Sequence, residues 1–159
     1  MHQIFEFRIL IYLLNYRGTE MKKTIGFTAG AFDMFHVGHL NLIKNAKARC
    51  DYLIVGVNTD ALVVSYKMKN VIVPLEERMQ IISALKYVDE VEIVDTLDKV
   101  EIWKRKRFDV VFIGDDWKGT KRWNETEAAL CDRCGVDVIY LPYTKGTTST
   151  ILREKLIEM

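Results

Sequence analysis

From residue 24 onward, short continuous apolar runs alternate with segments in which apolar residues recur every three or four positions. The continuous runs predict buried strands, and the recurring positions predict amphipathic helices. The expected strands cover residues 24–29, 52–58, 91–94, 110–113 and 136–141. The expected helices cover residues 38–49, a short stretch after Asp60 to about Tyr66, 75–86, 98–106, 123–134 and 149–158.

Strands that read as uninterrupted apolar runs and are separated by helices are typical of a parallel sheet covered on both faces. The pattern therefore predicts an α/β fold, a single-domain Rossmann-like doubly wound parallel sheet of about five strands. Right-handed crossovers place ligands at the carboxyl ends of such strands. Residues 67–73 show no clean periodicity, and we expect a mobile loop there.

The first twenty residues stand apart from this alternation. Their apolar stretch, residues 4–14, is interrupted by Glu6 and Arg8 and is too short to span a bilayer. It lacks the basic start and the small-residue cleavage site of a signal peptide. We expect residues 1–20 to be an upstream extension or a loosely docked helix, and residues 21–159 to form the functional domain.

The charge and the cysteine content of the chain limit the kinds of binding partner and metal site that we expect. The chain of 159 residues has a formal net charge of +1, which gives no electrostatic case for nucleic acid or an anionic membrane as partner. Three cysteines, an odd and low number, suit a reducing cytoplasm better than a disulfide framework. Cys131 and Cys134 form a lone Cys-x-x-Cys with no second pair to complete a zinc site, so we expect no protein-bound metal.

The segment from Gly30 to Leu40, GAFDMFHVGHL, contains the most specific pattern of the chain. An expected strand precedes it and an expected helix follows, so His36 and His39 flank a helix N-terminus, whose unpaired amides bind anions. Gly38 carries no Cβ and lets a ligand approach the backbone. The pattern indicates a polyphosphate site. A helix cap or a zinc site are the alternatives, and both are weaker explanations of two histidines in this setting.

Other phosphate-binding and nucleophile motifs are missing from the sequence. It has no Gly-x-x-x-x-Gly-Lys-Ser/Thr loop, no Gly-x-Gly-x-x-Gly fingerprint and no Gly-x-Ser-x-Gly elbow. Phosphates are therefore expected to meet histidines, lysines and a helix N-terminus, without a covalent intermediate.

The histidine segment resembles the signature of the cytidylyltransferase-type nucleotidyltransferases. Further similarities follow in the family's order, and together they cover about residues 22–156: KMK at 67–69, ER at 77–78, YVDEV at 87–91, GDDW at 114–117 and GTTST at 146–150. The GDDW segment is similar to the glycerol-3-phosphate cytidylyltransferase branch. The resemblance implies a nucleotidyltransferase domain over residues 21–159 that transfers CMP from CTP to a small phosphorylated alcohol, foremost glycerol 3-phosphate, giving CDP-glycerol and pyrophosphate.

The resemblance also implies roles for individual residues. Four are expected to be catalytic: His36, His39, Lys67 and Arg78. The nucleotide is expected to contact Ala31, Phe32, Gly38, Lys69, Asp115, Gly146, Thr148, Ser149, Thr150 and Arg153. The acceptor is expected to contact Asp33, Asp116, Trp117 and Lys86. Magnesium would arrive with the nucleotide, and the enzyme would be a cytoplasmic homodimer.

Several positions depart from the glycerol-phosphate pattern. Tyr143 stands where that branch has an arginine, and Lys86 stands where it has a second helix arginine. The sequence Ser149-Thr150-Ile151-Leu152-Arg153 is similar to an element of the adenylyltransferase branches. The alternatives are therefore an adenylyltransferase, a cytidylyltransferase for another polyol, ethanolamine or choline phosphate, and a nucleotide-binding protein without activity.

Overall fold

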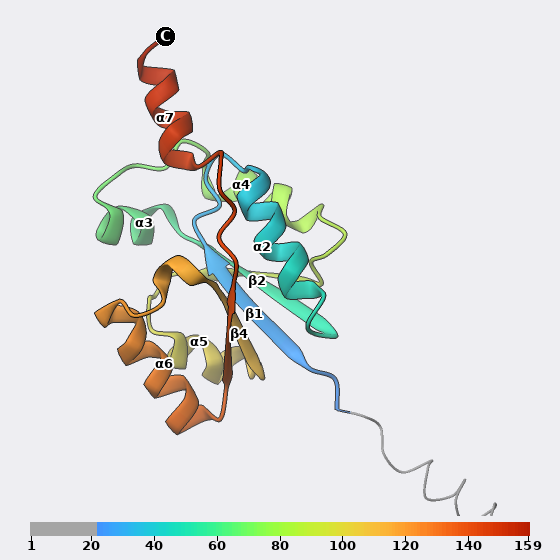
Figure 1. The fold of residues 1–159 in the computed structure, drawn as a ribbon. Coiled ribbons are helices and arrows are strands. Elements are labelled where there is room, and N and C mark those ends of the chain that lie inside the picture. Colours follow the sequence, from blue (N-terminus) through green and yellow to red (C-terminus); the bar gives the residue numbers. More distant parts are fainter. Residues whose placement is uncertain (1–21) are drawn as a thin grey trace, which may run out of the picture.

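The structure, a computed structural model, describes residues 22–159, so the expectation for residues 1–20 lies outside the described part. Five parallel strands form one sheet in the order β3-β2-β1-β4-β5 (Figure 1). Their bounds are β1 Ile25–Gly30, β2 Tyr52–Asn58, β3 Glu90–Val94, β4 Val110–Gly114 and β5 Asp137–Leu141. The predicted Rossmann-like α/β fold is confirmed.

Within residues 22–159, five α-helices and one 3-10 helix connect these strands, and a sixth α-helix, α7, follows the last strand. They are α2 Val37–Lys47, α3 Asp60–Lys67, α4 Leu75–Ser83, α5 Lys99–Lys106, the 3-10 helix η1 Asp115–Trp117, α6 Lys121–Cys134 and α7 Ser149–Ile157. Helices α2 and α4 lie on one side of the sheet and α5 and α6 on the other (Figure 1). None of these helices is long and apolar enough to cross a membrane.

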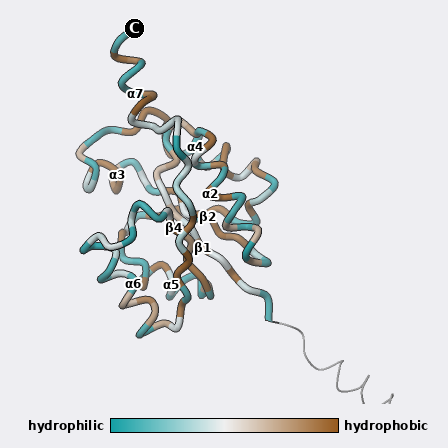
Figure 2. Tube along the Cα trace, viewed as in Figure 1, coloured by the Kyte–Doolittle hydropathy of each residue, from teal (hydrophilic) through white to brown (hydrophobic). Residues whose placement is uncertain are grey.

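Each face of the sheet has its own core. In β2, Leu53, Val55 and Val57 pack with Ile43 of α2 and with α4, whereas Ile54 faces the opposite core. Alternate residues of a strand point to opposite faces, which is why a continuous apolar run is needed when both faces are covered. Figure 2 shows the hydrophobic residues gathered along the central strands.

Helix ends explain most of the small differences from the predicted ranges. Thr59, Asp98, Thr120 and Thr148 each accept a hydrogen bond from a first-turn amide and so begin α3, α5, α6 and α7. Helix α4 is shorter than predicted: it ends at Ser83, and turns follow it as far as Val88. Helix α7 buries no residue and extends away from the sheet (Figure 1).

Candidate active site

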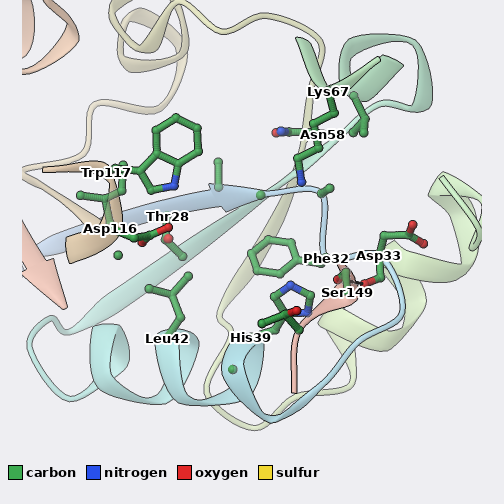
Figure 3. Close-up of a pocket in the computed structure, with 18 of the residues that line it drawn as sticks. Thr28, Phe32, Asp33, His39, Leu42, Asn58, Lys67, Asp116, Trp117 and Ser149 are labelled. Atoms are coloured by element: carbon green, nitrogen blue, oxygen red, sulfur yellow. Dashed lines mark hydrogen bonds between the residues drawn. The ribbon is translucent and has the colours of Figure 1, made fainter. Parts of the chain in front are cut away.

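A cleft with a cavity volume of about 580 Å³ lies at the carboxyl ends of the strands. It is centred at the point where the strand order reverses. The sheet grows from β1 through β2 to one edge and through β4 to the other edge. Such a switch point is where open α/β sheets bind ligands. In Figure 3, His39 and Leu42 approach the cleft from one side and Lys67 and Asn58 from the opposite side.

His36 caps helix α2 and is thereby held in one tautomer. The amide of Gly38 donates to Nδ1 of His36 over 3.1 Å. A neutral ring that accepts at Nδ1 carries its proton on Nε2, so that N–H is left to donate. A Cβ at Gly38 would lie 2.8 Å from Cε1 of His36. Gly38 therefore serves here to let the imidazole fold over the helix N-terminus.

His39 stacks on His36 with a distance of 3.8 Å between the ring centroids. The rings of Phe32 and Phe35 lie at 5.3 Å and 5.6 Å from the His39 ring. Burial first, and then the neighbouring His36 and Lys67, lower the pKa of His39 to about 3. Burial also lowers the pKa of His36. Both rings are thus neutral at pH 7 and donate as neutral imidazoles.

Nδ1 of His39 is buried and has no hydrogen-bond partner among the described residues. An unpaired buried polar atom costs free energy unless a ligand or water contacts it. His39 therefore holds a buried ring nitrogen that a bound ligand or water could satisfy, as is common at a binding site.

Lys67 and Lys69 line the cleft across from the histidines. Lys67 is the last residue of α3 rather than the start of a loop, and Met68 ends that helix in the left-handed conformation. Burial lowers the pKa of the Lys67 ammonium, while the nearby Asp33 carboxylate raises it. The pair places positive charge in the cleft, where it could neutralise an anionic ligand.

Asp33 connects three separate segments. Its carboxylate accepts hydrogen bonds from the amides of Ile72 and Val73 at 2.9–3.1 Å and forms an ion pair with Arg153 of α7. Arg153 also donates to the carbonyl of Asn70 over 2.7 Å. Burial raises the pKa of Asp33, but these amides and the guanidinium outweigh it, so the pKa lies below its ordinary value.

Asp33→Asn should lower the free energy of unfolding at pH 7 by about 1–3 kcal/mol, because an amide cannot accept from both backbone N–H groups and the guanidinium. The stability contributed by a lowered carboxyl pKa is present above 3.8 and is lost as the pH falls through the lower native value. Urea unfolding at pH 7 and pH 3 measures both values. Asp132→Asn, at an exposed site on α6, is the control. Equal stability of Asp33→Asn and wild type at pH 7 would contradict this role.

The hydroxyl-rich turn before α7 forms another wall. Thr148 caps α7, and Oγ of Ser149 donates to the carbonyl of Asp33 over 2.9 Å. Thr148, Ser149 and Thr150 line the cleft, but Gly146 does not. The N-terminus of α7 thus faces the same space as that of α2, and two helix N-termini favour an anion there.

Asp116, Trp117 and Tyr143 line the end of the cleft beside β4. In Figure 3, Asp116 and Trp117 lie opposite Asp33 and Ser149 along the cleft. Asp115 does not line it. Its Oδ1 accepts from the amide of Tyr143 over 3.0 Å, which ties η1 to the segment after β5.

Arg78 and Lys86 also lie off the cleft. Arg78 is only 1% exposed, and its guanidinium donates to the carbonyls of Val73, Ala31 and Asn58 and pairs with Asp60. Every partner belongs to a segment at the carboxyl ends of β1 or β2, or to the loop before α4. Lys86 is exposed and lies over the ring of Tyr87.

The remaining predicted residues do line the cleft. They are Ala31, Phe32, Asp33, His36, Gly38, His39, Lys67, Lys69, Asp116, Trp117, Thr148, Ser149, Thr150 and Arg153. Sequence reasoning missed a second group: Asn58, Tyr66, Lys99, Arg122 and Thr126. Of these, Asn58 follows a buried strand directly and could have been found by that position; the helix-surface cations carried no sequence signal.

Within residues 22–159, no group of three or more histidine, cysteine, aspartate or glutamate side chains could hold a metal ion. The three cysteines are free thiols. The cleft instead combines two neutral imidazole donors, two lysines, hydroxyls and two helix N-termini. This arrangement can bind a polyphosphate and stabilise charge on its oxygens without forming a covalent bond to it.

Comparisons with known proteins agree with this chemistry. Residues 27–155 match the family model described as cytidylyltransferase-like. The glycerol-3-phosphate cytidylyltransferase of Bacillus subtilis is 34% identical over 143 residues, which are 86% of this chain and 98% of that protein. A probable ethanolamine-phosphate cytidylyltransferase of Encephalitozoon cuniculi is 33% identical over 74% of this chain and 36% of its own length. The lipopolysaccharide core biosynthesis protein of Thermoplasma volcanium superposes with a TM-score of 0.66 at 25% identity, over 79% of this chain and 99% of that one.

Proposed function

The chain belongs to the cytidylyltransferase-like family of nucleotidyltransferases, and on that premise we propose that it transfers CMP from CTP to a small phosphorylated alcohol, with glycerol 3-phosphate as the first candidate. The products would be CDP-glycerol and pyrophosphate. One observation carries the proposal: His36, His39, Lys67 and the hydroxyls of the α7 turn converge on one cleft at the switch point of the sheet.

In the proposed reaction, a phosphate oxygen of the acceptor attacks the α-phosphorus of CTP. The new P–O bond forms as the bond from the α-phosphorus to the bridging oxygen breaks, and pyrophosphate leaves with that electron pair. The histidine N–H groups donate to oxygens of the transferring phosphate, and Lys67 and Lys69 neutralise charge on it. Asp33 holds the loop after α3 and the helix α7 in place around this centre.

Magnesium has no cage of protein ligands among the described residues. We propose that it enters bound to the triphosphate, whose oxygens supply the hard ligands that this ion prefers. The family resemblance also leads us to propose a homodimer in the cytoplasm. Asp116 and Trp117, which the resemblance implies as acceptor contacts, line the end of the cleft away from Asp33, and we propose that they also lie beside the base.

Pyrophosphate release from the full chain with magnesium tests the proposal. CTP and ATP are each combined with glycerol 3-phosphate, ribitol 5-phosphate, ethanolamine phosphate and choline phosphate. We expect release with CTP, and most rapidly with glycerol 3-phosphate. Release with ATP alone would place the chain among adenylyltransferases, and nucleotide binding without release from any pair would indicate a protein that has lost catalysis.

A further inference from the structure

A hydrogen bond joins helix α2 to the segment that connects β5 with α7. Nδ2 of Asn41, on α2, donates to Oγ1 of Thr144 over 3.1 Å, although the two residues lie 103 positions apart in the sequence. The connecting segment passes beside α2 in Figure 1. Thr144 lines the cleft, whereas Asn41 does not. Asn41 therefore holds a residue of the cleft wall from outside the cleft.

This hydrogen bond limits the direction in which the Thr144 hydroxyl can donate. A hydroxyl has one hydrogen and two lone pairs, and the amide of Asn41 occupies one lone pair of Oγ1. The hydrogen must then point away from Asn41. Within residues 22–159, the structure gives this hydroxyl no acceptor of its own. Because Thr144 lines the cleft, its hydrogen is available to a ligand there.

Thr144 lies beside the N-terminus of α2, close to the histidine pair. A Cβ added to Gly38 would lie 3.9 Å from Cβ of Thr144 and 2.8 Å from Cε1 of His36. The Thr144 hydroxyl, the Nε2 proton of His36 and the first-turn amides of α2 thus surround one region of the cleft. All of them are hydrogen-bond donors, and such a group suits the oxygens of a phosphate.

Few other contacts would hold the Thr144 hydroxyl in this orientation. Residues 145–147, which follow it, are exposed. The amide of Tyr143 donates to Oδ1 of Asp115 over 3.0 Å, but this bond holds the backbone and leaves the threonine side chain free. A threonine side chain can adopt several staggered rotamers, so its direction depends on the bond from Asn41.

We propose that Asn41 is a positioning residue, which holds the hydroxyl of Thr144 so that it donates to a phosphate oxygen of the bound nucleotide. The inference rests on the proposed function, since the ligand at the N-terminus of α2 is taken to be a nucleoside triphosphate. Asn41 itself does not contact this ligand. Its effect on binding is therefore expected only while residue 144 carries a hydroxyl, a condition that a purely structural role would not impose.

A double-mutant cycle on Asn41 and Thr144 tests this dependence. The dissociation constants of CTP and of inorganic triphosphate, each with magnesium, are measured by calorimetry with the full chain at pH 7. We expect Thr144→Val to weaken both ligands about tenfold, the effect of one hydrogen bond to a charged group. Asn41→Ala should weaken both about fivefold in the wild type and in Thr144→Ser, but less than about twofold in Thr144→Val.

Asn45→Ala is the matched control. Asn45 lies one turn further along α2 and does not line the cleft. Its replacement should leave both dissociation constants within about twofold of the wild type. Thermal unfolding of each variant accompanies the titrations, and because alanine favours a helix we expect Asn41→Ala to change Tm by no more than about 2 °C.

Equal losses from Asn41→Ala in the wild type and in Thr144→Val would overturn the proposal, because Asn41 would then act without the hydroxyl. Wild-type affinity in Asn41→Ala would overturn it as well. So would a loss of affinity for CTP but not for triphosphate, since Thr144 would then contact the nucleoside. Failure of the proposed function has a different signature: the dependence of Asn41 on Thr144 would be measured with triphosphate, but no acceptor would release pyrophosphate from CTP.

Discussion

His39→Ala should reduce pyrophosphate release by about 10²–10⁴-fold with whichever acceptor proves to be the substrate. In the proposed reaction the variant lacks a neutral N–H donor to the transferring phosphate, and donors of that kind contribute rate enhancements of this size. His36→Ala should cause a similar loss, since its Nε2 proton is fixed by the hydrogen bond from Gly38. The measurement is kcat for each variant beside wild type.

The stacking of the two rings leads to a second expectation. With centroids 3.8 Å apart, each imidazole helps to hold the other, so the double variant should be little slower than either single one. Activity that stayed within tenfold of wild type in both single variants would contradict the assignment. His39→Asn, which keeps an N–H donor, and thermal unfolding of each protein separate lost chemistry from lost packing against Phe32 and Phe35.

Arg78→Met should destabilise the domain by about 3–5 kcal/mol, which corresponds to a fall in Tm of roughly 6–20 °C. The methionine fills similar space, but it leaves the carbonyls of Ala31, Asn58 and Val73 without their buried donor. Thermal unfolding by circular dichroism measures the change. Arg78→Lys should lose less, since a single ammonium replaces part of the planar fork of donors.

The same variant decides between two roles for this arginine. As a catalytic residue that contacts the substrates, which the resemblance implies, Arg78 would affect kcat or the KM for the acceptor and leave Tm unchanged. The structure places it 1% exposed and off the cleft, so we expect the opposite. Lys86→Met, at an exposed site that is also off the cleft, is the matched control and should shift Tm by only about 1–2 °C.

The sequence was most informative where one physical requirement acted alone. The bounds of β2 were predicted to the residue, because a strand covered on both faces must be apolar throughout and Asp51 and Thr59 frame it. The predicted range of α4 was too long. Apolar residues continue at helical spacing through Leu85, but the helix ends before Ala84, which is its C-cap. Periodicity records which residues can face a core, and it does not record where a helix stops.

The sequence located in the cleft the residues on turns at strand ends, and it misplaced residues whose position depends on tertiary packing. His36, His39 and the α7 hydroxyls sit directly at helix N-termini, where spacing fixes their location. Arg78 lies on an amphipathic helix. No sequence pattern indicates that its guanidinium is buried and donates hydrogen bonds to three carbonyls. Lys99 and Arg122 look like ordinary helix-surface cations until α5 and α6 are packed together over the cleft.

The carboxylate of Asp33 joins parts of the chain that are synthesised at very different times. Its partners are residues 72 and 73 in the middle of the chain and Arg153, six positions before the end of the sequence. During translation, the first loop with Asp33 emerges long before Arg153, which pairs with that aspartate. The wall of the cleft is therefore completed only with the last helix, and a chain that is truncated before α7 would retain most of its core without that wall.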